Sequence, residues 1–264
     1  MSDQELVDQL SDVWASILEL GATLTEAEWK QPSLLPGWSN QDVVAHMLWS
    51  ECALLGWPVP DHVAPPMEHV RTEFGAFIEN GVDSYRAQAG IEVLAQFAAA
   101  AEARIDALRA LDADGFGGPV TFPIGDGTVR GVLPFRIFDC WIHEQDIRIA
   151  LDRPGGWETS AVDLVFDRLF SSMGKVVAKH VGAPEGTVVV WRVGGARHAI
   201  EVRDGRGRSV DAPDTPAVVL VLEPEVFLML TAGRGNPDAL IPLVRVEGDA
   251  SLGMRVLERM NVLF

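Results

Sequence analysis

The 264-residue sequence is poor in cysteine and in basic residues. Its two cysteines, Cys52 and Cys140, are too few for a disulfide scaffold or for a zinc site built from four thiolates. Only 21 Lys and Arg stand against 38 Asp and Glu, which gives a formal net charge of -17. This balance excludes nucleic acid and anionic membranes as expected partners, because both are bound through Lys and Arg.

Long apolar runs are also missing. No run approaches the ~18 residues that span a bilayer, and the acidic start of the chain has no apolar signal core. We therefore expect a cytoplasmic protein with reduced thiols. The 48% hydrophobic content is typical of a globular protein, and the length corresponds to a little under two domains of about 150 residues.

The first part of the chain has the pattern of helices. Apolar residues from Leu6 to Leu18 recur at the spacing of one helical face. A second helix is expected to begin after Ser39, an N-cap with Asp42 at the third helical position, and to end near Gly56. This helix is apolar nearly all round, which predicts that it is buried on most sides.

Further helices are expected over residues 68–86, 91–111 and 134–151, with a Gly- and Pro-rich stretch at 112–131 that could hold a hairpin. Several long helices around one fully buried helix suggest a four-helix bundle.

After Gly156 the pattern becomes α+β, and the domain boundary is expected near residue 155, giving domains 1–155 and 156–264. Val-rich alternation and Gly-containing turns favour antiparallel strands. The expected elements are a helix at 160–180, strands at 187–193, 198–202 and 217–222, a short helix after Pro224, a strand at 244–246 and a helix at 250–261.

Two of the six histidines lie where bundle helices could turn them inward, namely His46 and His143. Asp139 precedes His143 by four residues, so the two share one helical face about 6 Å apart along the axis. Bundles hold metals through inward side chains of facing helices. Two imidazoles, one carboxylate and an open position match the pattern of catalytic zinc.

Simpler interpretations of these residues remain open. Asp139 and His143 could form a surface ion pair, and a buried His46 could be a core histidine with satisfied hydrogen bonds. Cys52 and Cys140 lie in apolar helical surroundings, which predicts unreactive core thiols.

Three stretches of the chain carry a family resemblance. They are Leu35–Ser39 with Asp42–His46, Phe138–Arg148, and Val246–Ala250 with Asn261–Val262. In this order they resemble the mycothiol-dependent maleylpyruvate isomerase family, a branch of the DinB-like metalloproteins. The resemblance spans nearly the whole chain and implies a DinB-like four-helix bundle followed by a smaller, sterol-carrier-like α+β domain.

The resemblance also implies a cofactor set. A divalent metal, usually zinc with nickel or iron as alternatives, would be held by His46, Asp139 and His143. Better-known members have Glu or His where this chain has Asp139, whose side chain is shorter by a methylene. The thiol cofactor would be mycothiol, the low-molecular-weight thiol of actinobacteria, and the 18 Arg against 3 Lys are typical of such GC-rich genomes.

The implied activity is that of a thiol-dependent isomerase or S-transferase acting on a small electrophile. A thiol coordinated to a metal is deprotonated, and the thiolate is the nucleophile. Arg234 follows a glycine where the family often has Gly-Arg, and would bind a substrate carboxylate in the cleft between the domains unless it lies on the surface. Arg136 and Asp146 flank the expected ligands and could orient them.

Two other functions fit the same sequence. One is a non-catalytic small-molecule-binding protein with a degenerate, metal-free bundle, and the other is a regulatory protein that binds metal without turnover. The chain is expected to be a monomer or a homodimer.

Overall fold

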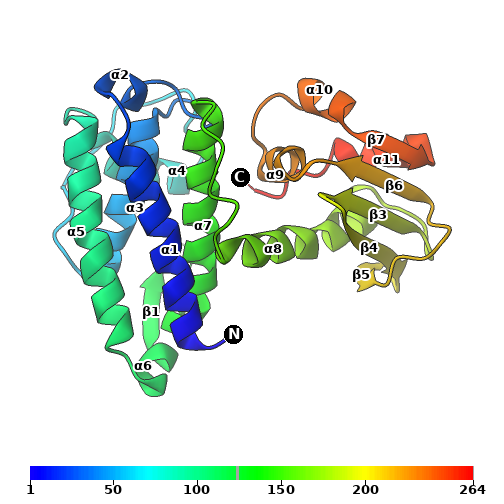
Figure 1. The fold of residues 1–264 in the computed structure, drawn as a ribbon, viewed down its shortest axis with the longest axis horizontal. Coiled ribbons are helices and arrows are strands. Elements are labelled where there is room, and N and C mark those ends of the chain that lie inside the picture. The colour runs from blue at the N-terminus through cyan, green and yellow to red at the C-terminus, as the bar shows by residue number, and fades with distance from the viewer. Residues whose placement is uncertain (123–124, 264) are drawn as a thin grey trace. The chain divides into compact units, whose positions relative to one another are not determined.

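The computed structural model describes residues 1–122 and 125–263. It divides into two compact units, Met1–Val165 and Phe166–Phe264. The first unit is mostly helical, and the second, smaller unit holds a five-stranded sheet (Figure 1). This confirms the expected order of a helical domain followed by an α+β domain. The division between the units falls within helix α8 (Ala161–Lys175), and the exact domain boundary, expected near residue 155, stays a prediction.

Among the residues that the structure describes, the first unit consists mostly of four long helices, with three short helices, the paired strands β1 and β2 and the start of α8. α1 packs against α5 and α7, and α3 packs against the same two helices, so their apolar faces share one core (Figure 1). The elements are α1 (Asp3–Ala22), α2 (Glu26–Trp29), α3 (Asn40–Leu55), α4 (Glu73–Asp83), α5 (Gly90–Arg109), α6 (Ala113–Gly117), β1 (Pro119–Phe122), β2 (Gly125–Thr128) and α7 (Val129–Ala150).

Helix α3 begins and ends as the sequence predicts. The Ser39 hydroxyl accepts a hydrogen bond from the Asp42 N–H, and the Asp42 carboxylate accepts one from the Ser39 N–H, which is a capping box. Gly56 ends the helix with a φ of 68°. Every residue from Asn40 to Cys52 is buried except His46, so the most enclosed helix exposes part of one histidine.

Two helix starts differ from the sequence-based expectation. α4 begins at Glu73 rather than near residue 68, because the Thr72 hydroxyl caps it by accepting from the Gly75 N–H. α7 begins at Val129 rather than at Pro134, because Thr128 caps it in the same way. Pro134 is therefore inside the helix, where it removes one backbone donor.

The sheet of the second unit has the strand order β5-β4-β3-β6-β7. β3 and β6 pair in parallel, whereas the other neighbours are antiparallel, so the expectation of antiparallel strands is wrong for this pair. The difference arises from β5, a strand that the sequence pattern did not predict. β5 follows β4 as a third antiparallel strand, and residues 211–217 then connect it to β6 on the other side of β3. The elements are β3 (Val188–Val193), β4 (Ala196–Arg203), β5 (Arg206–Val210), β6 (Val218–Leu222), α9 (Pro224–Ala232), α10 (Pro237–Leu240), β7 (Arg245–Gly248) and α11 (Ala250–Leu257).

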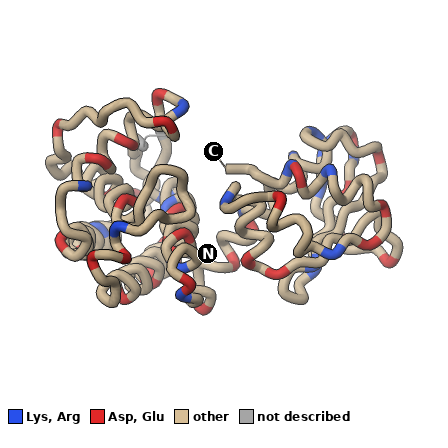
Figure 2. The backbone as a smooth tube through the Cα atoms, turned by 90° about the horizontal axis from the view of Figure 1, so that it is seen from above, with Lys and Arg blue, Asp and Glu red and all other residues tan. Residues whose placement is uncertain are grey.

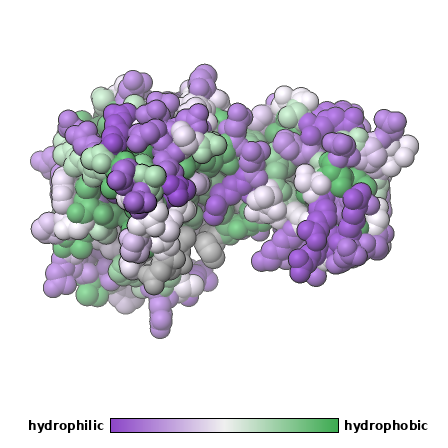
Figure 3. Space-filling model, turned by 90° about the horizontal axis from the view of Figure 1, so that it is seen from below, coloured by the Kyte–Doolittle hydropathy of each residue, from purple (hydrophilic) through white to green (hydrophobic). Residues whose placement is uncertain are grey.

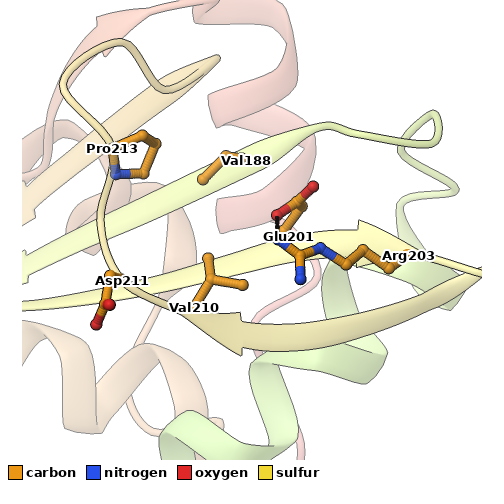
Figure 4. A pocket seen from close by; sticks show the side chains of 6 residues that line it. All are labelled: Val188, Glu201, Arg203, Val210, Asp211 and Pro213. Carbon is orange, nitrogen blue, oxygen red and sulfur yellow. Dashed lines mark hydrogen bonds and ion pairs between the residues drawn. The ribbon is translucent and has the colours of Figure 1, made fainter.

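The two faces of this sheet differ. On one face Phe170 of α8 stacks on His198 and on Phe227 of α9. The other face carries a small apolar cluster around Val190 and Val219, next to a surface pocket of about 480 Å³ (Figure 4). In this pocket Glu201 and Arg203 form an ion pair at 2.5 Å. The lining residues are Val188, Glu201, Arg203, Val210, Asp211 and Pro213.

The net negative charge of the chain comes from the first unit. Residues 1–165 contain 26 Asp and Glu against 9 Lys and Arg, whereas residues 166–264 contain 12 of each (Figure 2). In the view of Figure 3, polar and apolar side chains are interspersed over the surface. Within the described part of the chain, every helix is too short or too polar to cross a membrane.

Candidate metal centre

Helices α3 and α7 bring His46, Asp139 and His143 together. One ligand atom from each residue lies within 4.8 Å of the other two. His46 Nε2 is 3.5 Å from Asp139 Oδ2, and His143 Nε2 is 3.5 Å from Asp139 Oδ1. The centroids of the two imidazoles are 5.1 Å apart. Two ring nitrogens and a carboxylate thus face one point.

The surroundings of this point do not match the simpler interpretations. The side chain of His143 is 9% exposed and that of Asp139 is 19% exposed, so the pair is not an ordinary surface ion pair. Nδ1 of His46 is buried and has no hydrogen-bond partner among residues 1–122 and 125–263, so His46 is not a satisfied core histidine. Whether the three residues hold a metal stays a prediction.

Each of the two α7 side chains is held by a residue three positions away. Asp146 Oδ2 lies 3.0 Å from His143 Nδ1. With the proton on Nδ1, the lone pair of Nε2 points toward Asp139, as in histidines that ligate metals. Arg136 Nη1 donates to Asp139 Oδ2 at 2.5 Å. These contacts fix the orientation of both side chains.

Arg136 lies behind Asp139, in the interior. Its side chain is 2% exposed, and its Nε donates to Glu51 Oε1 at 2.8 Å. Arg104 Nε lies 3.5 Å from the other oxygen of Glu51. Arg104, Glu51, Arg136 and Asp139 thus form a row of alternating charges, in which Glu51 fixes the guanidinium of Arg136 beside Asp139.

The neighbouring charges set the pKa values of the three residues. Burial lowers the pKa of His46, which keeps the ring neutral near pH 7. Burial opposes ionisation of Asp139, but His143 and Arg136 hold its pKa well below the usual range. Burial also opposes protonation of His143, but Asp139 and Asp146 raise its pKa to about 9. In the metal-free protein the ring of His143 is therefore doubly protonated near pH 7, and its Nε2 can bind a metal only after losing its proton.

Trp38, which the sequence predictions included only within the Leu35–Ser39 stretch, completes the centre. The ring of Trp38 lies 5.5 Å from that of His46 and 6.4 Å from that of His143, centroid to centroid. Its Nε1 donates to Glu79 Oε2 at 2.8 Å. Glu79 carries no signal in the sequence, because it is one of 38 acidic residues and lies 41 positions from Trp38.

Neither cysteine is placed as a nucleophile. Both thiols are buried and free, and burial raises the pKa of Cys52 and raises that of Cys140 to about 12. Cys140 Sγ accepts hydrogen bonds from Trp14 Nε1 and Arg136 Nη2. Buried thiols with raised pKa values are unreactive near neutral pH.

Arg234 belongs to the second unit, and its part in the site stays a prediction. It is 8% exposed, and its Nη1 donates to the carbonyl of Ala232. Gly233 ends α9 with a φ of 66°, and a Cβ there would lie 2.5 Å from Asn261 Nδ2. The Gly-Arg pair and the Asn261 stretch are thus neighbours.

Comparison with known proteins identifies the family. The family model of the mycothiol maleylpyruvate isomerase N-terminal domain matches residues 10–148, a range that contains all three candidate ligands. A crystal structure of a histidine-to-alanine mutant of the mycothiol-dependent maleylpyruvate isomerase has a TM-score of 0.57 and 17% identity, covering 94% of this chain and 93% of that chain. Another crystal structure of the mycothiol-dependent maleylpyruvate isomerase has a TM-score of 0.55 and 18% identity, covering 89% and 90%. No curated protein matches the chain.

Proposed function

Because this chain belongs to the mycothiol maleylpyruvate isomerase family, we propose that it is a metal-dependent, mycothiol-dependent isomerase or thiol S-transferase. Its substrate would be a small electrophile, and a carboxylate on it would be bound by Arg234. The observation that carries the proposal is the meeting of His46, Asp139 and His143 within 4.8 Å. The solved relatives are maleylpyruvate isomerases, but a shared fold does not fix the substrate.

The residues present fit a divalent metal. The donor set is Nε2 of His46, Nε2 of His143 and an oxygen of Asp139, which leaves a position open as in catalytic zinc sites. Imidazole ligands suit zinc first, and also nickel and iron. A bound cation would supply the positive charge that keeps a thiol deprotonated near neutral pH.

The side chains around the donor set have defined tasks in this proposal. Asp146 holds the proton on Nδ1 of His143, which leaves Nε2 as the donor. Arg136 positions the carboxylate of Asp139 and keeps it ionised. Because Cys52 and Cys140 are buried with raised pKa values, the nucleophilic sulfur comes from the small-molecule thiol.

Elemental analysis of protein purified without a metal-affinity tag tests the first part. We expect close to one equivalent of zinc, nickel or iron in the wild type and loss of metal in His46→Ala and His143→Ala. His62→Ala is the matched control, since His62 pairs with Asp83 instead. Less than about a tenth of an equivalent in the wild type contradicts a metal centre.

Turnover of a panel of electrophiles in the presence of mycothiol tests the second part. Isomerised product and mycothiol consumption are measured separately, because isomerisation returns the thiol whereas S-transfer consumes it. We expect turnover that needs both metal and mycothiol, and that disappears in His46→Ala and His143→Ala. Turnover that survives in both variants means that the site is placed wrongly. A full metal content with neither isomerised product nor mycothiol consumption favours the alternative, a protein that binds metal or a small molecule without catalysis.

A further inference from the structure

We propose that Glu79 is a positioning residue of the metal centre, which acts through Trp38 on the imidazole of His46. This inference rests on the proposed function, in which His46 is a metal ligand. It adds a residue from α4, a helix that contributes none of the three ligands.

The two histidines of the centre are held in different ways. The ring of His143 is fixed by a hydrogen bond from Nδ1 to Asp146. The ring of His46 has no such bond, since its buried Nδ1 has no partner in the part of the chain that the structure describes. Ligating histidines generally need an outer contact to fix the ring. For His46 that contact must come from packing.

Trp38 supplies the packing. Its ring lies against that of His46 at a centroid distance of 5.5 Å and an angle of 42°. It also lies 6.4 Å from the ring of His143. A side chain enclosed by rings loses rotational freedom. The orientation of His46 therefore depends on where the indole of Trp38 lies.

Glu79 fixes the indole. Its Oε2 accepts the hydrogen bond from Trp38 Nε1 at 2.8 Å, and the same oxygen lies 3.0 Å from His69 Nε2. Its Oε1 pairs with Arg86 Nη2 at 2.6 Å. The Glu79 side chain is only 3% exposed, so an ionised carboxylate with three partners acts as a rigid anchor.

The backbone beside Trp38 supports the same arrangement. Gly37 has a φ of 79°, and a Cβ there would lie 2.1 Å from His69 Nδ1. His69 therefore packs directly on the turn before Trp38 while its other nitrogen contacts Glu79. The turn and the indole are held by one cluster, which consists of His69, Glu79 and Arg86.

The test measures zinc affinity in four variants by competition with a chelator. We expect Glu79→Ala to weaken binding by about tenfold, in the range found for outer contacts of metal ligands. Glu79→Gln keeps an acceptor for the indole and should restore most of this loss. Trp38→Phe should weaken binding too, and Glu79→Ala should add little in the Trp38→Phe background.

Asp83→Ala is the control for a merely structural effect. Asp83 lies one turn beyond Glu79 on α4 and also pairs with Arg86 and with a histidine, but its partners do not include Trp38. We expect the zinc affinity of this variant to equal that of the wild type. A folded Glu79→Ala variant with wild-type affinity overturns the proposal, as does an equal loss in Asp83→Ala.

A metal-free measurement separates this inference from the proposed function. In apo protein, NMR should show that the indole N–H signal of Trp38, assigned by its loss in Trp38→Phe, and the ring signals of His46 shift in Glu79→Ala but not in Asp83→Ala. If the wild type held no metal, the proposed function would be contradicted, and the NMR comparison would still test whether Glu79 positions the ring of His46. Unmoved His46 signals would then refute the positioning role.

Discussion

Arg136 carries a buried positive charge between two carboxylates, and its removal has a defined consequence. In Arg136→Met, the fully buried Glu51 keeps only Arg104, at 3.5 Å. Breaking a buried ion pair from one side typically costs ~3–5 kcal/mol. We expect a loss of stability of about this size in urea unfolding. Arg130→Met, which breaks an exposed pair with Asp3, should change stability little; equal losses in both variants would contradict the assignment.

Metal binding should depend on pH through one histidine. In the metal-free protein the pKa of His143 is raised to about 9, so a metal must displace a proton from it below that pH. His46, whose pKa is lowered, is already neutral at pH 7 and contributes no proton. The apparent association constant should therefore rise about tenfold per pH unit between about pH 7 and 9, and then level off. Chelator competition across this range measures the slope, and a flat profile would show that His143 is not a ligand.

The three candidate ligands could be predicted from the sequence, whereas the residues that pack around His46, namely Trp38 and Glu79, could not. Helical spacing placed Asp139 and His143 on one face, the enclosed helix after Ser39 supplied His46, and the family resemblance implied the same three ligands. Trp38 and Glu79 meet only because α4 packs against α3, and no periodicity within one helix reports such a contact.

The stability of helix α3 depends on its first turn. Ser39 follows Trp38 directly, and its hydroxyl caps the helix that carries His46. Ser39→Ala should destabilise the protein by about 1 kcal/mol, whereas Ser39→Asp should retain most of the stability. Urea unfolding measures both, and equal stability of Ser39→Ala and the wild type would mean that tertiary packing alone fixes this end of α3.

The elements that were predicted well are those with local signals. The start and end of α3 follow from Ser39, Asp42 and Gly56, all of which act on the backbone within a few residues. β5 was missed because its sequence, RGRSV, is polar and its residues are mostly exposed. The parallel pairing of β3 with β6 depends on that missed strand, so one omission altered the expected topology.

Arg234 is proposed to bind a carboxylate of the substrate. If Arg234 binds a carboxylate, Arg234→Ala should raise KM for a carboxylate substrate while metal content stays at the wild-type level. Arg259→Ala, a change of an exposed arginine on the same unit, serves as control. An unchanged KM in Arg234→Ala would remove this residue from the site.

The nucleophilic sulfur of the proposed reaction is expected to come from outside the chain. The only two cysteines are buried, free and of raised pKa, so the chain offers no reactive thiol of its own. A Cys52→Ala, Cys140→Ala double variant should keep mycothiol-dependent turnover, even though the cavity at Cys140 lowers its stability. The assay is run well below the unfolding temperature of the variant, with and without mycothiol. Loss of turnover in the folded, metal-loaded double variant would mean that a thiol of the protein takes part in the reaction. Retained turnover would leave the added thiol as the source of the nucleophile. The reaction would then require no cysteine of this chain.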